Sequence, residues 1–145
     1  MTYPVISFEP TSDHAEVSAE IERYLLDALA SLNAQSTNES IVVTARDSNG
    51  RIVGGISGST SYGWLLVKLL WVNQELRETG IVRALMAEAE TRTKALGCHG
   101  DWLDTSSEHA HAFYLRLGYS DFGELSNGLS NDPIGHRRWF MQKAL

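Results

Sequence analysis

One tyrosine, Tyr114, stands where its hydroxyl could act as a proton donor. The segment from Ala110 to Tyr119 favours a helix in which Ala110 and Tyr114 share a face, because they are four residues apart. A tyrosine hydroxyl that reaches a cleft can protonate a leaving group. The competing interpretation is that Tyr114 only packs in the core, and the spacing alone favours that interpretation.

A second segment, from Arg77 to Arg83, could bind phosphate. It joins an apolar stretch, expected to be a strand, to an expected helix, with Gly80 at the junction. The first turn of a helix offers unpaired amides and partial positive charge, and a glycine there lets an anion approach closely. Alternatively, Gly80 only shortens a loop, Arg77 is solvated, and Arg83 pairs with nearby acids.

The residue that would accept a proton from a substrate is less clear. Asp104 lies at the end of one predicted strand, and His136 opens another. Histidine titrates near neutral pH and suits this task. We rank Asp104 and His136 first and His109, His111 and Glu124 below them, although each histidine could instead be an ordinary surface residue. The spacing of histidine and cysteine predicts no metal site.

The elements that must position these residues follow from hydrophobic spacing and turn residues. Strands are predicted at residues 5–8, 41–46, 51–59, 64–72, 100–105, 119–125 and 136–143, and helices at 13–32, 80–96 and 106–117. A polar loop is predicted at 33–39. This order predicts an α/β layered domain with helices on a mixed sheet.

Composition limits the classes of function. The chain has 145 residues and a net charge of −6, which fits a single domain over residues 1–145 and disfavours nucleic-acid or anionic-membrane partners. The single cysteine cannot form an internal disulfide, and the N-terminus lacks the pattern of a signal peptide. A cytoplasmic protein is therefore expected, and its acidic field would favour a cationic ligand.

Taken together, two motifs resemble those of the GCN5-related N-acetyltransferase (GNAT) superfamily. They read Arg77-x-x-Gly80-x-Val82 and Ser107-x-x-Ala110-x-x-Phe113-Tyr114, and Gly118-Tyr119 closes the second. The match is tight from about residue 64 to 125, and the order of elements extends it to nearly the whole chain. The resemblance implies an α+β fold with a mixed, mostly antiparallel sheet and helices on both faces.

The resemblance also implies acetyl-CoA as cosubstrate and direct acetyl transfer to an amine. Tyr114 matches the family's usual general acid, which protonates the departing thiolate, and the strand before the turn would pair with the pantetheine arm. The implied cofactor contacts are Leu70, Trp71, Val72, Arg77, Glu78, Thr79, Gly80, Ile81, Val82, Arg83, Ser107, Ala110 and Tyr114.

Three positions depart from the family pattern. Val82 replaces a smaller residue, Glu78 stands where glycine is commonest, and Ser107 replaces asparagine. The expected function is N-acetylation of a small-molecule amine. The alternative is a GNAT-like domain with altered or lost acetyl-CoA use, serving as a binding or regulatory module or catalysing other chemistry.

The aromatic residues suggest two further features. Trp71 and Trp102 could line the acceptor pocket, which would favour an amine with an apolar body. Trp139 and Phe140 on the last predicted strand are compatible with a homodimer.

Overall fold

The computed structural model describes residues 2–32 and 36–145, and the chain divides into two units, 1–35 and 36–145. In the first unit a 3-10 turn, η1 (Thr11–Asp13), leads into helix α1 (His14–Leu32), which confirms the helix predicted at 13–32. Residues 33–35 of the predicted loop lie outside the described ranges. The prediction of one domain over residues 1–145 stays a prediction.

The predicted strand at Val5–Phe8 is wrong. No strand is present in residues 2–10, and Val5 and Ile6 are 92% and 95% exposed. A strand exists through the hydrogen-bonded ladder it shares with a neighbour. A β-prone sequence without such a partner leaves the chain merely extended.

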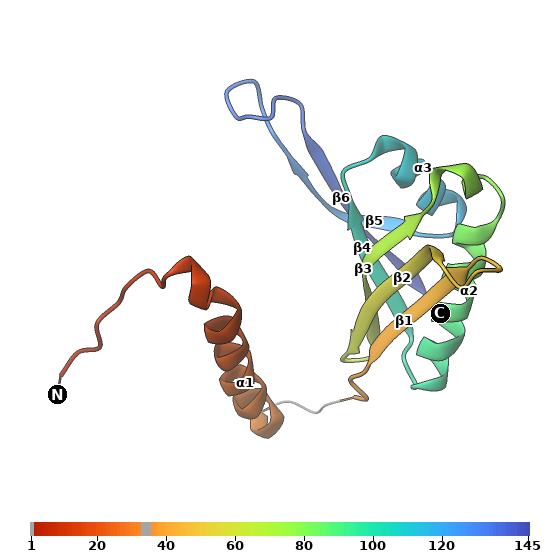
Figure 1. Ribbon diagram of the computed structural model, residues 1–145. Coiled ribbons are helices and arrows are strands. Elements are labelled where there is room, and N and C mark those ends of the chain that lie inside the picture. The colour runs from red at the N-terminus through yellow and green to blue at the C-terminus, as the bar shows by residue number, and fades with distance from the viewer. Residues whose placement is uncertain (1, 33–35) are drawn as a thin grey trace. The chain divides into compact units, whose positions relative to one another are not determined.

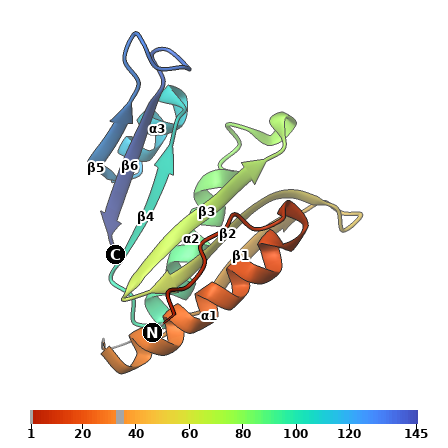
Figure 2. The same cartoon turned by 90° about the vertical axis from the view of Figure 1, so that its left-hand side faces the viewer.

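The second unit contains a six-stranded sheet in the order β1-β2-β3-β4-β6-β5 (Figures 1 and 2). Its strands are β1 (Ser40–Arg46), β2 (Ile52–Ser61), β3 (Trp64–Val72), β4 (Gly100–Thr105), β5 (Ser120–Ser126) and β6 (Arg137–Ala144). Only β3 and β4 pair in parallel; the other four neighbouring pairs are antiparallel. The prediction of a mixed, mostly antiparallel sheet is confirmed.

Two helices pack on this sheet. Helix α2 (Ile81–Ala95) connects β3 to β4 and contacts β1, β2 and β3, and helix α3 (Glu108–Arg116) connects β4 to β5 and contacts β4. A crossover helix is the usual connection between parallel neighbours such as β3 and β4. Among the described residues, no helix is long and apolar enough to cross a membrane.

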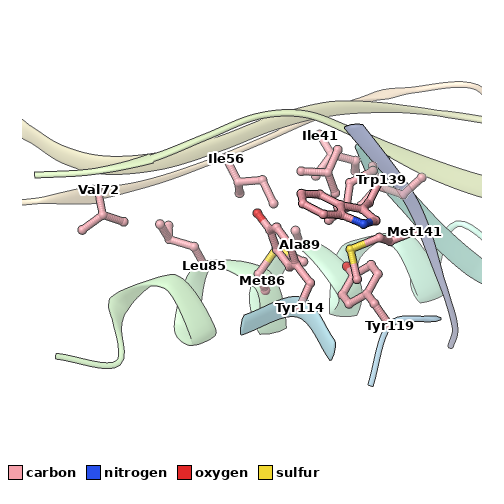
Figure 3. Close-up of a cluster of buried hydrophobic side chains, with 13 residues drawn as sticks. Ile41, Ile56, Val72, Leu85, Met86, Ala89, Tyr114, Tyr119, Trp139 and Met141 are labelled. Atoms are coloured by element: carbon pink, nitrogen blue, oxygen red, sulfur yellow. The ribbon is translucent and has the colours of Figure 1, made fainter. Parts of the chain in front are cut away.

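The hydrophobic core lies between these helices and the sheet (Figure 3). Leu85, Met86 and Ala89 come from α2, and Tyr114 comes from α3. The strands supply alternate residues: Leu65 of β3 and Leu103 of β4 are 1% and 2% exposed. Because side chains alternate between the faces of a strand, the residues next to these two face away from the helices.

Candidate functional site

Strands β3 and β4 are paired only near their N-terminal ends and then separate. Only Trp64, Leu65 and Leu66 of β3 pair with β4, and the last of these pairs is Leu66 with Trp102. Beyond Leu66, no described strand pairs with β3 on the side that faced β4. The fork between the two strands therefore leaves backbone groups of Leu70, Trp71 and Val72 without a strand partner on that side among the described residues.

A β-bulge lies just past the fork. Gly58 of β2 pairs with Val67, whereas the adjacent Ser57 pairs with Leu69, so Lys68 is the extra residue on β3. Such a bulge bends a strand and increases its twist. A Cβ atom at Gly58 would collide with the carbonyl oxygen of Leu66, which explains the glycine on the partner strand.

The chain then turns through η2 (Gln74–Leu76) into helix α2. Asn73 caps η2, its Oδ1 accepting from the Glu75 amide at 3.2 Å, and the Thr79 hydroxyl donates to the Leu76 carbonyl oxygen. Glu78 and Gly80 both have positive φ angles, 64° and 87°. Glycine adopts this conformation without strain, so the position where this chain carries Glu78 is suited to glycine.

The N-terminus of α2 is suited to a phosphate group. The first amide of the helix with an internal partner is that of Ala84, which donates to the Gly80 carbonyl oxygen at 3.0 Å. The amides of Ile81, Val82 and Arg83 precede it, where a helix has no acceptor of its own. A Cβ atom at Gly80 would meet nothing within 4 Å, so the approach to these amides is open.

The side chains around this turn divide into two sets. Ile81 and Val82 pack against the core, so the additional methyl groups of Val82 are used in packing. Arg77 and Arg83 are exposed, and within the described ranges neither guanidinium has an acidic partner. The alternative in which Arg83 pairs with nearby acids is therefore not observed there.

Helix α3 brings Tyr114 beneath the sheet. Ser107 caps the helix, its Oγ accepting from the Ala110 amide at 3.1 Å, and Ala110 packs against the core. The Tyr114 side chain is 8% exposed, and burial raises its pKa to about 12. In Figure 3 its hydroxyl points toward the strands, on the side of Ile56. The hydroxyl therefore stays protonated near neutral pH and can donate a hydrogen bond.

The two leading candidates for proton acceptor lie at the same end of the sheet. Asp104 of β4 forms an ion pair with Arg138 of β6 at 3.6 Å, and His136 lies 3.4 Å from the Ser106 hydroxyl. These residues lie at the C-terminal end of β4 and the N-terminal end of β6. The open end of the fork is at the same edge of the sheet, because β4 runs parallel to β3. Arg138 gives no local signal in the sequence, because its contact joins two strands that are far apart along the chain.

Two of the weaker candidates, His111 and Glu124, have other partners. His111 contacts both carboxylate oxygens of Asp121 at 2.9 Å and stacks on Trp139 with ring centroids 4.4 Å apart. Glu124 accepts two hydrogen bonds from Arg137, which lower the pKa of that carboxyl group. These contacts are typical of structural pairs. Among the described residues, no cluster of three or more His, Cys, Asp or Glu side chains could hold a metal ion.

A buried cluster at the start of β4 also had no signal in the sequence. Asp101 is fully buried, and neither of its carboxylate oxygens has a hydrogen-bond partner among the described residues. Close to it, Lys143 of β6 forms an ion pair with Glu90 of α2 at 3.0 Å. Burial raises the pKa of Asp101 to about 7, and nearby Glu90 adds to that effect.

Comparison with known proteins shows the family to which the chain belongs. Residues 7–119 match the profile of the Acetyltransferase (GNAT) family. The chain is 34% identical over 120 residues to an acetyltransferase of Agrobacterium fabrum, covering 80% of this chain and 88% of that one. It is also 39% identical over 97 residues to blasticidin-S acetyltransferase of Streptomyces morookaense, covering 66% and 68% of the two chains.

Solved structures share the fold. The crystal structure of a candidate acetyltransferase from Agrobacterium tumefaciens superposes with a TM-score of 0.82 at 27% identity, covering all of both chains. An aminoglycoside 6'-N-acetyltransferase complexed with coenzyme A superposes with a TM-score of 0.63 at 23% identity, covering 73% of each chain. The family match spans most of this chain and contains both motifs, and the chain belongs to the GNAT family of acetyltransferases.

Proposed function

We propose that this protein binds acetyl-CoA along β3 and at the N-terminus of α2, and transfers the acetyl group to the amine of a small molecule. The proposal depends on one observation: a forked sheet lies next to the N-terminus of α2, which is flanked by Arg77 and Arg83, and neither guanidinium has an acidic partner among the described residues. The fork offers backbone groups to the pantetheine arm. The turn offers amides and positive charge to the diphosphate.

The proposed chemistry is a single acyl transfer. The neutral amine attacks the thioester carbonyl carbon, a C–N bond forms, and the C–S bond breaks with its electron pair leaving on sulfur. The amine loses a proton to Asp104 or His136, directly or through water, and the thiolate gains one. Tyr114 donates a hydrogen bond to the leaving sulfur as negative charge develops on it.

The relatives support the class of acceptor. Blasticidin-S acetyltransferase and the aminoglycoside acetyltransferase are named for small-molecule acceptors. The net charge of −6 would favour acceptors that are cationic in solution. Because Arg77 and Arg83 supply local positive charge, the turn can still hold an anion within an acidic protein.

Calorimetric titration with acetyl-CoA tests the proposal, with two arginines of α2 as a matched pair. Arg83→Ala removes an unpaired guanidinium beside the turn. Arg92→Ala removes a guanidinium that pairs with Glu88 at 3.0 Å, about two and a half helical turns farther along α2. We expect Arg83→Ala to weaken acetyl-CoA binding about tenfold, the value of one charge-assisted contact to phosphate.

Arg92→Ala should leave the affinity unchanged, and S-acetylpantetheine, which lacks the diphosphate, should bind wild type and Arg83→Ala equally. Equal losses in the two variants would contradict the assignment of the turn. Absence of any acetyl-CoA binding by the wild-type protein would favour the alternative of a GNAT-fold binding module.

A further inference from the structure

A pocket with aromatic walls lies on the face of the sheet opposite α2 and α3. Its volume is about 380 Å³, and it is lined by Ser61, Tyr62, Trp64, Trp102, Phe122 and Gln142. The neighbours Leu65 and Leu103 are core residues, so Trp64 and Trp102 project to the other face. The volume falls within the range of small-molecule sites.

The walls of this pocket are held in place. Trp64 pairs with Gly100 across the strands, and a Cβ atom at Gly100 would collide with the Trp64 ring. The ring of His99 meets the Trp64 ring edge-on, with centroids 5.1 Å apart at 78°. The Trp64 ring therefore packs on Gly100 and against the His99 ring, and these contacts fix the orientation of Trp64 before any ligand binds.

The opposite wall is also aromatic. The rings of Trp102 and Phe122 meet edge-on with centroids 6.3 Å apart, and Phe122 in turn contacts Phe140 at 6.3 Å. None of the described residues that line the pocket is charged. The polar side-chain groups are those of Ser61 and Gln142, together with the Tyr62 hydroxyl and the indole N–H groups of the two tryptophans. Such a pocket favours a planar, largely apolar body with room for one polar substituent.

The position of Trp102 connects the pocket to the fork. Trp102 pairs with Leu66, the last pair before β3 and β4 separate, and Asp104 follows on the same face of β4. Two residues of a strand span about 7 Å. The ion pair of Asp104 with Arg138 joins two side chains that are 41% and 46% exposed, and an exposed pair of this kind is weak. A cationic group of a ligand can therefore displace Arg138.

We propose that the acceptor is a primary amine joined by a short chain to a planar aromatic body. The body occupies the pocket of Trp64, Trp102 and Phe122, and the amine reaches the fork beside Asp104. This inference rests on the proposed acetyltransferase function and specifies its acceptor class. The pocket orients the acceptor, and the fork supplies the acetyl group.

The experiment compares two amines that differ only in the body. Phenethylamine carries a ring two carbons from its amine, whereas propylamine lacks a ring. With acetyl-CoA present, release of the CoA thiol gives kcat/KM for each. We expect phenethylamine to exceed propylamine by at least about tenfold, because burial of one ring stabilises its complex.

Three variants in the pocket and one control outside it test where that preference comes from. Trp102→Ala and Phe122→Ala should each reduce the ratio of the two kcat/KM values to below about two, and Trp102→Phe should keep most of it. Phe122 is 51% exposed, so its truncation spares the core and provides a second test if Trp102→Ala does not fold. Leu129→Ala, a residue 91% exposed and outside the pocket, should leave the ratio unchanged.

Calorimetry with each amine in the absence of acetyl-CoA separates this inference from the proposed function. If phenethylamine binds more tightly than propylamine and Phe122→Ala abolishes the difference, the proposed pocket is supported even when no CoA is released. In that case only the proposed acetyltransferase function fails. Equal kcat/KM for the two amines overturns the pocket while the function stands. Absence of both binding and transfer overturns both.

Discussion

At the scale of single residues, Tyr114 is the group whose removal should separate chemistry from binding. Its hydroxyl is kept protonated by burial, which raises its pKa to about 12. An ordinary thiol has a pKa of about 8.5, so complete transfer of this proton to the thiolate is uphill. The expected role of Tyr114 is therefore a hydrogen bond to the leaving sulfur, with the final proton supplied by the amine or by solvent.

We predict that Tyr114→Phe lowers kcat about 100-fold and leaves the Kd for acetyl-CoA within about twofold. Stopped-flow or steady-state release of CoA gives the rate, and calorimetry gives the Kd. Because the hydroxyl loses its proton only near pH 12, the ratio of wild-type to variant kcat should be constant from about pH 7 to about pH 10. An unchanged kcat would remove Tyr114 from the mechanism.

At the scale of elements, the bulge in β3 is the feature that shapes the fork. Gly58 opposes it, and a methyl group there would collide with the backbone oxygen of Leu66 rather than with a flexible side chain. Gly123 of β5 offers a matched control, since its Cβ would make ordinary contacts of 3.8 Å with Phe140. Neither glycine has a positive φ angle, so the two substitutions differ in space and not in conformation.

Gly58→Ala should therefore lower the free energy of unfolding by about 2 kcal/mol, the usual cost of overpacking, and weaken acetyl-CoA binding by shifting β3. Gly123→Ala should change both quantities little. Urea unfolding and calorimetry measure them. Equal effects of the two substitutions would show that the close approach at Gly58 is relieved at no cost, and the bulge would then not depend on glycine.

Sequence patterns predicted the elements whose signals are local. The apolar run of β3 and the glycine at the start of α2 each act within a few residues, and the strand and the helix predicted from them are confirmed. The predicted strand at Val5–Phe8 failed because pairing, not composition, makes a strand. The bulge at Lys68 gave no signal, because it depends on the register between two strands.

The residues of the candidate site also fall into those with a local sequence signal and those without one. The turn and Tyr114 belong to contiguous motifs, so sequence alone could locate them. The ion pair of Asp104 with Arg138 and the pocket around Trp102 join strands that are distant in sequence. The sequence suggested Trp71 and Trp102 as residues that line an acceptor pocket, but only the fold shows which rings surround Trp102.

At the scale of the whole molecule, the charged groups behind the net charge of −6 are unevenly distributed. In the turn before α2, Arg77 and Arg83 have no acidic partner among the residues that the structure describes, whereas the start of β4 has an aspartate in the interior. There Asp101 is fully buried near Glu90, Lys143 and Tyr119, and one lysine faces two carboxyl groups. The cluster can avoid a net negative charge in the core only by retaining a proton.

That cluster predicts a pH dependence of stability with a definite sign. Burial, reinforced by Glu90 and opposed by Tyr119 and Lys143, raises the pKa of Asp101 from 3.8 to about 7 in the folded protein. The folded state then binds a proton that the unfolded state has released, so stability falls as pH rises from about 4 to about 7. Three pKa units correspond to at most about 4 kcal/mol.

We predict that Asp101→Asn removes this loss. The free energy of unfolding of the variant relative to wild type should rise between about pH 4 and about pH 7, then level off, because the amide has no charge to desolvate. Asp27→Asn, at an exposed position on α1, should show no such trend. Urea unfolding at several pH values measures both differences, and taking differences cancels the carboxyl groups common to all three proteins. A difference between Asp101→Asn and wild type that is independent of pH would mean that Asp101 is already ionised in the core, held by Lys143 alone.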